Sequence, residues 1–238
     1  MFIPLYDGVP LRHLKRPLAT RALVGACLAG YLAPLFGLLP VSEPWLYAGF
    51  GLIPGVLFGT EALPEGLPFV PEPLTLATSL FLHGSVLHLL GNMLFLWVFG
   101  DNVEDATGSA RFLLFYLACG IAAGLAHAWF TPDQTKPLIG ASGAISGVVA
   151  AYLVLYPRVR LWGLFFAGIP LRLPAYLAIG MWIAVQVGAA LLGGGDEAVG
   201  WFAHVGGLVA GALLIPLVRH RYDPAIARLR ATDGGEPG

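Results

Sequence analysis

Hydrophobic residues dominate the chain in long runs that contain no Asp, Glu, Lys or Arg, and short polar segments separate these runs. A helix of about 20 residues crosses the roughly 30 Å hydrocarbon core of a membrane. Each run is long enough for one such helix, so the pattern predicts six transmembrane helices and an all-α polytopic membrane fold. The runs are residues 22–42, 73–100, 112–132, 137–157, 173–195 and 198–218.

The segments outside the runs predict the domain organisation. Residues 1–21 are expected to form a cytoplasmic N-terminal segment, 22–218 a single six-helix domain, and the polar residues 219–238 a disordered cytoplasmic tail. Pro and Gly exclude one regular helix through 43–72, an apolar and aromatic stretch that we expect in the outer membrane interface. The run 161–171 is too short to cross a membrane and is predicted to be a connecting loop or interfacial turn.

The composition agrees with a membrane protein. Hydrophobic residues make up 57% of the chain and charged residues only 11%, whereas soluble domains carry about 25% charged residues. A net charge of −1 gives no indication of nucleic-acid binding. Cys27 and Cys119 both fall in apolar runs, so neither a disulfide framework nor a CxxC metal pair is available. No cofactor or metal is expected.

The distribution of Lys and Arg predicts the orientation. With six spans, both termini lie on one side of the membrane, together with twelve of the thirteen basic residues; only Lys136 falls on the other side. Basic residues favour the cytoplasmic side, so both termini are predicted to be cytoplasmic, with the protein in the plasma (inner) membrane. The twelve are Arg12, Lys15, Arg16, Arg21, Arg111, Arg158, Arg160, Arg172, Arg219, Arg221, Arg228 and Arg230.

Four polar residues inside the apolar runs are predicted to reach a similar depth on the outer side. His88 and Asn92 are four residues apart in the run 73–100, so they share one face of a helix. Ser142 begins the helix of the fourth run, and His204 lies in the outer half of the sixth. Polar groups at membrane depth are costly, and each is therefore a functional hypothesis.

Rows of small residues predict that the fourth and sixth helices touch. Gly143 and Gly147 form one row, and Gly207 and Gly211 form another. Such rows let membrane helices approach closely. Contact between the two rows would bring Ser142 of the fourth helix close to His204 of the sixth. Upstream, Pro137 and Gly140 oppose helix formation, so the helix is expected to start at the serine.

This arrangement favours acyl transfer at a serine. A serine hydroxyl becomes a good nucleophile when a base removes its proton, and His204 would be that base. The oxyanion that forms needs hydrogen-bond donors, which Asn92, His88 and the backbone N–H of Ser142 would supply. No acidic residue lies near His204 in the last run. The sequence therefore predicts a Ser–His dyad rather than a Ser–His–Asp triad.

Four segments of the chain resemble the rhomboid family of intramembrane serine proteases. They are HGSVLHLLGN, the expected turn GDNVEDATG, GASGAISG and AHVGGLVAG, and the resemblance covers roughly residues 75–215. It implies a six-helix rhomboid-like bundle that cleaves transmembrane proteins within the lipid bilayer, near its outer face. Ser142 matches the nucleophile, His204 the base, and His88 and Asn92 the oxyanion side chains. The supporting positions are His83, Gly140, Gly143, Gly207 and Gly211.

Two positions depart from the family pattern. Many members carry a Trp-Arg pair between the first two helices, whereas here Leu46 follows Trp45. Some members have a Tyr four residues after the serine, packed on the catalytic histidine, and here that residue is Ser146. Which group orients His204 is therefore left open. Glu104 is expected to cap or anchor the turn that follows the second helix.

Two other functions remain compatible with these residues. One is a rhomboid-like protein that binds membrane clients without cutting them. The other is a membrane metal hydrolase with zinc on His83, His88, His127 and His204, although no HExxH motif occurs and no carboxylate lies at that depth. The sequence does not indicate the substrate or the oligomeric state.

Overall fold

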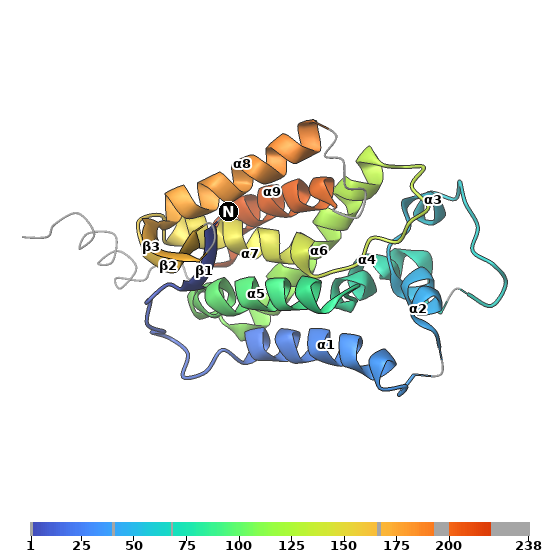
Figure 1. Cartoon of the computed structure of the whole chain (residues 1–238), viewed down its shortest axis with the longest axis horizontal. Helices are drawn as coiled ribbons and strands as arrows, with labels where there is room; N and C mark the ends of the chain where they lie inside the picture. The colour runs from blue at the N-terminus through green and yellow to red at the C-terminus, as the bar shows by residue number, and fades with distance from the viewer. Residues whose placement is uncertain (1, 40, 68, 166–167, 193–199, 220–238) are drawn as a thin grey trace, which may run out of the picture.

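The computed structural model describes residues 2–39, 41–67, 69–165, 168–192 and 200–219 (Figure 1). The predicted tail falls almost wholly outside these ranges. The elements, in chain order, are β1 (Phe2–Tyr6), α1 (Leu18–Leu35), α2 (Glu43–Phe50), α3 (Pro54–Leu57), η1 (Glu72–Leu74), α4 (Thr75–Thr78), η2 (Ser79–Phe81), α5 (Val86–Thr107), α6 (Ser109–Phe130), α7 (Ser142–Leu155), β2 (Arg160–Phe165), β3 (Ile169–Pro174), α8 (Ala175–Leu191) and α9 (Trp201–Val218).

The long helices α1, α5, α6, α7, α8 and α9 each fall on one of the six predicted runs. Within the described ranges, α1, α5, α6 and α9 are long and apolar enough to cross a membrane. The other two are also apolar but shorter, with 14 residues in α7 and 17 in α8. The predicted polytopic helical bundle is confirmed, and the chain is an integral membrane protein.

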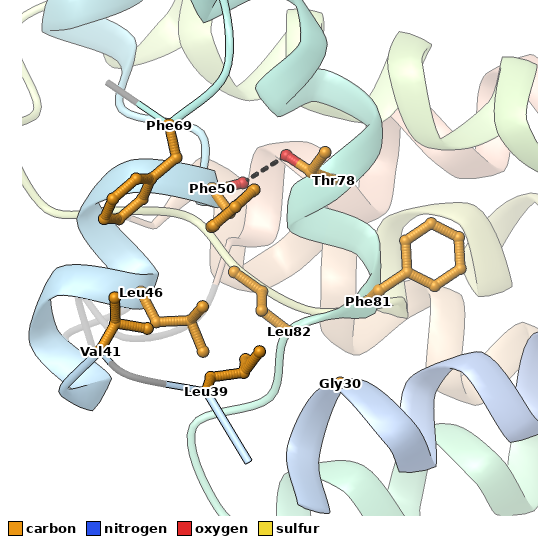
Figure 2. Close-up of a pocket in the computed structure, with 9 residues that line it drawn as sticks. All are labelled: Gly30, Leu39, Val41, Leu46, Phe50, Phe69, Thr78, Phe81 and Leu82. Carbon is orange, nitrogen blue, oxygen red and sulfur yellow. Dashed lines mark hydrogen bonds between the residues drawn. The ribbon is translucent and has the colours of Figure 1, made fainter. Parts of the chain in front are cut away.

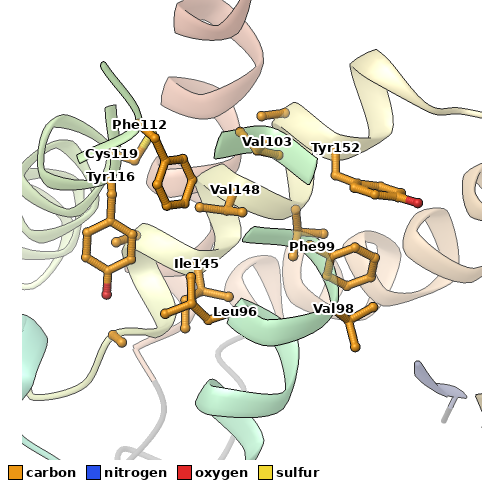
Figure 3. Packing of buried hydrophobic residues seen from close by; sticks show 14 of the residues in the cluster. Leu96, Val98, Phe99, Val103, Phe112, Tyr116, Cys119, Ile145, Val148 and Tyr152 are labelled. Carbon is orange, nitrogen blue, oxygen red and sulfur yellow. The ribbon is translucent and has the colours of Figure 1, made fainter. Parts of the chain in front are cut away.

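Helix α7 lies at the centre of the bundle, in contact with α5, α6, α8 and α9 (Figure 1). Every residue from Gly143 to Tyr152 is buried. A helix that is apolar on all sides must be surrounded by other helices. Its side chains Val148 and Tyr152 belong to the same apolar cluster as Phe99 of α5 and Phe112 of α6 (Figure 3). The rings of Phe99 and Tyr152 meet edge to face, with centroids 4.8 Å apart.

Helices α7 and α9 touch through their backbones, as the two rows of small residues predict. A Cβ atom added to Gly207 would collide with the carbonyl oxygen of Gly143, and one added to Gly211 would collide with that of Gly147. On its other side Gly147 faces α6, where an added Cβ would lie 2.6 Å from the sulfur of Cys119. No larger residue than glycine fits at these crossing points.

Helix α5 differs from the helix predicted over 73–100. It begins at Val86, after the N-cap Ser85, whose hydroxyl oxygen accepts a hydrogen bond from the backbone N–H of His88 at 3.1 Å. It continues through Thr107, so most of GDNVEDATG is helix and not a turn. The prediction ended the helix at the first charged residue. The helix continues because carboxylates beyond that point are paired with backbone N–H groups of the N-terminal segment.

Two of these carboxylates hold the start of the chain against α5. Asp105 accepts hydrogen bonds from the backbone N–H groups of residues 12–14 at 2.7 to 2.9 Å. Glu104 accepts from the N–H of Ala19 at 3.0 Å, and from both the N–H and the hydroxyl of Thr20 at 2.8 Å. The first N–H groups of a helix have no partner within it. Glu104 therefore does act as an anchor, and what it caps is the start of α1.

A three-stranded antiparallel sheet lies where a loop was predicted. Within the run 161–171, residues 161–165 belong to β2 and residues 169–171 to β3, and the two strands pair with Trp162 opposite Arg172. Strand β1, from the N-terminal segment, adds to β2 with Phe2 opposite Phe165. The description all-α therefore holds for the bundle but not for this end of the molecule. Length and hydropathy identify membrane spans, whereas the strands here are short and β1 pairs with a strand more than 150 residues away in the sequence, which hydropathy along the chain does not reveal.

Asp7 joins the end of β1 to the bundle. Its carboxylate accepts hydrogen bonds from the hydroxyl of Tyr152 at 2.8 Å and from the amide of Asn102 at 2.7 Å. Burial raises the pKa of Asp7 above its ordinary value. The hydrogen bonds from Tyr152 and from backbone N–H groups lower this pKa, but by less than burial raises it.

No single helix runs through the segment 43–72, which agrees with the prediction. The segment does contain the short helices α2 and α3. Tyr47 of α2 donates to the carbonyl of His83 at 3.1 Å, and Thr78 of α4 donates to the carbonyl of Phe50 at 2.7 Å. An apolar cavity of about 430 Å³ lies between α2, the end of α1 and η2 (Figure 2). Its lining includes none of the predicted site residues, so it is separate from them.

The anchor at Glu104 leads to a stability prediction. Glu104→Ala removes the buried carboxylate that accepts four hydrogen bonds. The donors are the N–H groups of Ala19 and Thr20 and the hydroxyls of Thr20 and Ser109. We expect it to lower the free energy of unfolding by at least about 2 kcal/mol, the upper end for loss of a helix cap. Thermal unfolding of the purified protein, followed by tryptophan fluorescence, measures the change. The exposed Glu65→Ala is the control, and an equal shift in both variants would contradict the anchor.

Candidate active site

Ser142 is the first residue of α7, and the backbone before it explains why the helix starts there. Gly140 has φ +119°, a conformation that side-chain-bearing residues rarely adopt, so the helix cannot extend backwards through it. The N–H of Gly140 donates to the carbonyl of Ser79 at 2.9 Å, and Leu138 pairs with Leu52. The serine therefore lies at the end of a loop that is held on both sides.

His88 and Asn92 of α5 lie against the same loop. A Cβ added to Gly140 would lie 2.7 Å from Nε2 of His88 and 3.7 Å from Nδ2 of Asn92. Space and backbone conformation both require glycine at this position. The two side chains predicted to share a helix face thus converge two residues before Ser142.

The hydroxyl of Ser142 lies 2.8 Å from Nε2 of His204, a good hydrogen-bonding distance. Both residues are half-buried. The predicted contact between the serine and the histidine is therefore present, at the end of the bundle opposite the sheet. It follows directly from the glycine contacts between α7 and α9, because a wider separation of the two helices would break it.

Asn92 has a buried amide nitrogen without a partner. The residue is 8% exposed, and Nδ2 makes no hydrogen bond within the described structure. Most buried polar side-chain atoms in proteins are hydrogen-bonded, so an exception calls for an explanation. At this position the free N–H is available to an oxygen atom that enters the site.

His83 lies behind His88, with the two ring centroids 5.1 Å apart in an edge-to-face arrangement. It is 1% exposed, and its carbonyl is bound by Tyr47. This location suits the supporting part predicted for it. Among the described residues, no three His, Cys, Asp or Glu side chains converge as metal ligands. The geometry thus does not favour a zinc site on His83, His88, His127 and His204.

Gln186 of α8 is part of the site, and the sequence analysis did not identify it. Its Oε1 atom lies 2.6 Å from Nδ1 of His204, and the residue is 5% exposed. A signal was present, since Gln186 is the one side-chain amide in the run 173–195. Polar residues inside a membrane helix are rare and often functional. The serine and histidine were located by their spacing from glycines, and Gln186 has no such motif around it.

Two tryptophans flank the ring of His204, with centroid distances of 6.1 Å for Trp201 and 6.3 Å for Trp182. Ser146, at the position of the family tyrosine, donates instead to the carbonyl of Ser142 at 2.7 Å. The surroundings of His204 are therefore Gln186 and two indole rings in place of a tyrosine.

Comparison with known proteins identifies the family of the chain. The model of the Rhomboid domain matches residues 71–221. Rhomboid protein 1, mitochondrial, of Saccharomyces cerevisiae is 31% identical over 150 residues, which cover 61% of this chain and 42% of that protein. Rhomboid protease GluP of Bacillus subtilis is 47% identical over 78 residues, or 33% of this chain and 15% of GluP.

RHOMBOID-like protein 6, mitochondrial, of Arabidopsis thaliana is 32% identical over 143 residues, which cover 60% of this chain and 43% of the relative. The match thus spans less than half the length of each of these three relatives. The matched domain nevertheless includes well over half of the present chain, together with Ser142, His204, His88 and Asn92. The chain belongs to the rhomboid family.

Proposed function

We propose that this protein is an intramembrane serine endopeptidase that cleaves transmembrane proteins near the outer face of the membrane. The observation that carries the proposal is the 2.8 Å distance between the hydroxyl of Ser142 and Nε2 of His204. The unpaired amide of Asn92 beside them supports it, because peptide-bond hydrolysis requires a donor at that place.

In the acylation step, the hydroxyl oxygen of Ser142 attacks the carbonyl carbon of the scissile peptide bond while Nε2 of His204 takes the hydroxyl proton. The C–N bond then breaks, and Nε2 of His204 gives this proton to the leaving amine. An acyl ester of Ser142 remains. In the second step a water molecule transfers a proton to His204 and attacks the ester, which releases the carboxylic acid and restores the serine hydroxyl.

The negative charge of the tetrahedral intermediate falls on the former carbonyl oxygen. The amide of Asn92, the ring of His88 and the backbone N–H of Ser142 are the groups available to bind it. Ser142 begins a helix, so its N–H has no acceptor within α7. The positive end of the helix dipole also favours negative charge there. Donors already in position need no reorganisation when the charge develops.

The length of α7 supports a substrate that lies within the membrane. Its 14 residues extend about 21 Å, less than the roughly 30 Å hydrocarbon core. A nucleophile at the start of so short a helix would lie below the membrane surface, where transmembrane segments are within reach. Proteins of this family act on transmembrane substrates, which agrees with this location.

The basic residues support an orientation with both termini cytoplasmic. Arg160 begins β2, the backbone N–H of Arg12 donates to Asp105 near the end of α5, and Arg111 lies in the first turn of α6. Lys136 instead lies six residues before Ser142, which begins α7. We therefore place the catalytic end on the outer side of a plasma (inner) membrane. Two of the compared relatives are named as mitochondrial, so a mitochondrial membrane is the competing location.

The dyad leads to the first test of this function. We expect Ser142→Ala and His204→Ala each to abolish cleavage of a transmembrane substrate in proteoliposomes. Residues that act as a unit give non-additive losses, so the double variant should be hardly worse than either single one. Ser146→Ala is the matched control, because this serine lies one turn further along α7 and its hydroxyl donates to the carbonyl of Ser142.

Retained cleavage by purified Ser142→Ala protein would reject the mechanism. Labelling by a serine-directed fluorophosphonate separates an active enzyme from an inactive client-binding relative. The wild-type protein is expected to react at Ser142. A folded wild-type protein that neither reacts nor cleaves would favour the inactive alternative.

Asn92 gives a kinetic prediction. Its amide would bind an oxygen that becomes negative only during the reaction, and losing one such donor typically lowers kcat by about 10²–10³, or roughly 3–4 kcal/mol. We expect Asn92→Ala to lower kcat by that order with little change in KM. Asn102→Ala is the contrast at the other end of α5, where loss of the bond to Asp7 should lower stability and leave kcat per folded molecule unchanged.

The orientation is tested by labelling single cysteines in intact cells with a membrane-impermeant maleimide. With Cys27 and Cys119 replaced by alanine, Ala62→Cys is expected to react and Thr232→Cys to remain unlabelled until the cells are permeabilised. The reverse pattern would place the serine on the cytoplasmic side.

A further inference from the structure

We propose that Gln186 is a positioning residue that holds His204 in the tautomer and orientation needed to act as a base. The inference rests on the proposed function, in which His204 takes the proton of Ser142. It goes beyond the dyad, because the second ring nitrogen of His204 then has a specific partner on a different helix.

The geometry divides the two ring nitrogens between two partners. Nε2 lies 2.8 Å from the hydroxyl of Ser142, and Nδ1 lies 2.6 Å from Oε1 of Gln186. The carbonyl oxygen of an amide only accepts hydrogen bonds, so Nδ1 must carry the proton. Neutral imidazole has one N–H, which leaves Nε2 with the lone pair that receives the proton of Ser142.

The opposite tautomer would be inactive as a base. With the proton on Nε2, the ring would donate to Ser142 and could not accept from it. A bond to Nδ1 selects between these tautomers and fixes the rotation of the ring, as a neighbouring carbonyl or carboxylate does for histidine bases and metal ligands. After proton transfer, the carbonyl of Gln186 also faces the positively charged imidazolium.

A neutral amide suits the surroundings of His204. Gln186 is 5% exposed on an apolar helix, and Trp182 and Trp201 lie against the His204 ring. An ionised carboxylate without a close cation would be expensive at this depth. The amide supplies the required acceptor at a smaller desolvation cost. This accounts for a site that has no acidic partner for its histidine within the described residues.

The bond also depends on how α8 packs. Ala178 and Ile179 belong to the buried cluster, whereas Val185 and Leu191 are 60% and 79% exposed. Gln186 is thus buried although its neighbour Val185 faces outward, and the side chain of Gln186 points toward His204 of α9. Displacement of α8 from α9 would remove the acceptor from Nδ1 without moving Ser142 or His204.

The test compares three substitutions at position 186 with a control. Gln186→Leu removes the acceptor, Gln186→Glu keeps an acceptor, and Gln186→Lys presents only donors. Val185→Leu, on the adjacent exposed position, controls for changes in α8. We measure kcat and KM for a transmembrane substrate, the rate of fluorophosphonate labelling of Ser142, and thermal stability, all on the full chain in proteoliposomes.

Mutation of a residue that hydrogen-bonds and orients a metal-binding histidine typically lowers metal affinity or activity 10–100-fold, and we expect a loss of activity of similar size here. Gln186→Leu and Gln186→Lys should lower both kcat and the labelling rate about 10–100-fold with KM unchanged. Gln186→Glu should lose less than about tenfold. A merely structural role predicts parallel losses of folded protein instead, with normal kcat per folded molecule and no recovery by Glu.

Wild-type kcat in Gln186→Leu would overturn the inference, as would a Glu variant no better than the Leu variant. Neither result would affect the proposed protease if Ser142→Ala is inactive. Conversely, cleavage by Ser142→Ala would reject the protease mechanism itself, whatever the variants at position 186 do.

Discussion

The contact between α7 and α9 is limited only by their backbones, and the geometry of the candidate site depends on it. Gly207 and Gly211 face the carbonyl oxygens of Gly143 and Gly147, and any side chain at either position on α9 would separate the helices. Lipid is as apolar as the helix surfaces, so the hydrophobic effect does little to hold membrane helices together, and close packing becomes the main attraction. The 2.8 Å distance between Ser142 and His204 follows from this packing.

The buried polar groups at the two ends of the bundle differ in whether they have hydrogen-bond partners. At the sheet end, Glu104 and Asp105 satisfy backbone donors of the N-terminal segment, and Asp7 binds Tyr152 and Asn102. At the opposite end, the amide of Asn92 is buried without a partner. An unsatisfied buried group lowers stability. The buried carboxylates near the sheet are thus satisfied by hydrogen bonds, whereas the Asn92 amide near Ser142 is not.

The surroundings of His204 reflect the low polarity of the membrane. In soluble serine proteases a buried aspartate orients the histidine. Here the group at Nδ1 is the neutral amide of Gln186, and two indole rings flank the imidazole. Neutral partners keep a polar site within an apolar bundle without a buried ion pair, whose desolvation cost is large.

The membrane class, the six apolar runs, the contact of the glycine rows and the convergence of Ser142 with His204 could all be predicted from the amino-acid sequence. These features depend on local composition and helical spacing, which a single chain displays directly. The remaining features depend on contacts between segments that are far apart in the sequence. Helix α5 continues past its charged residues because backbone N–H groups far away in the sequence donate hydrogen bonds to Glu104 and Asp105, and the sheet includes a pairing of β1 with the distant β2. Gln186 reaches His204 only through the packing of α8 on α9, because the spacing of residues along one helix does not specify which side chain of another helix it will meet.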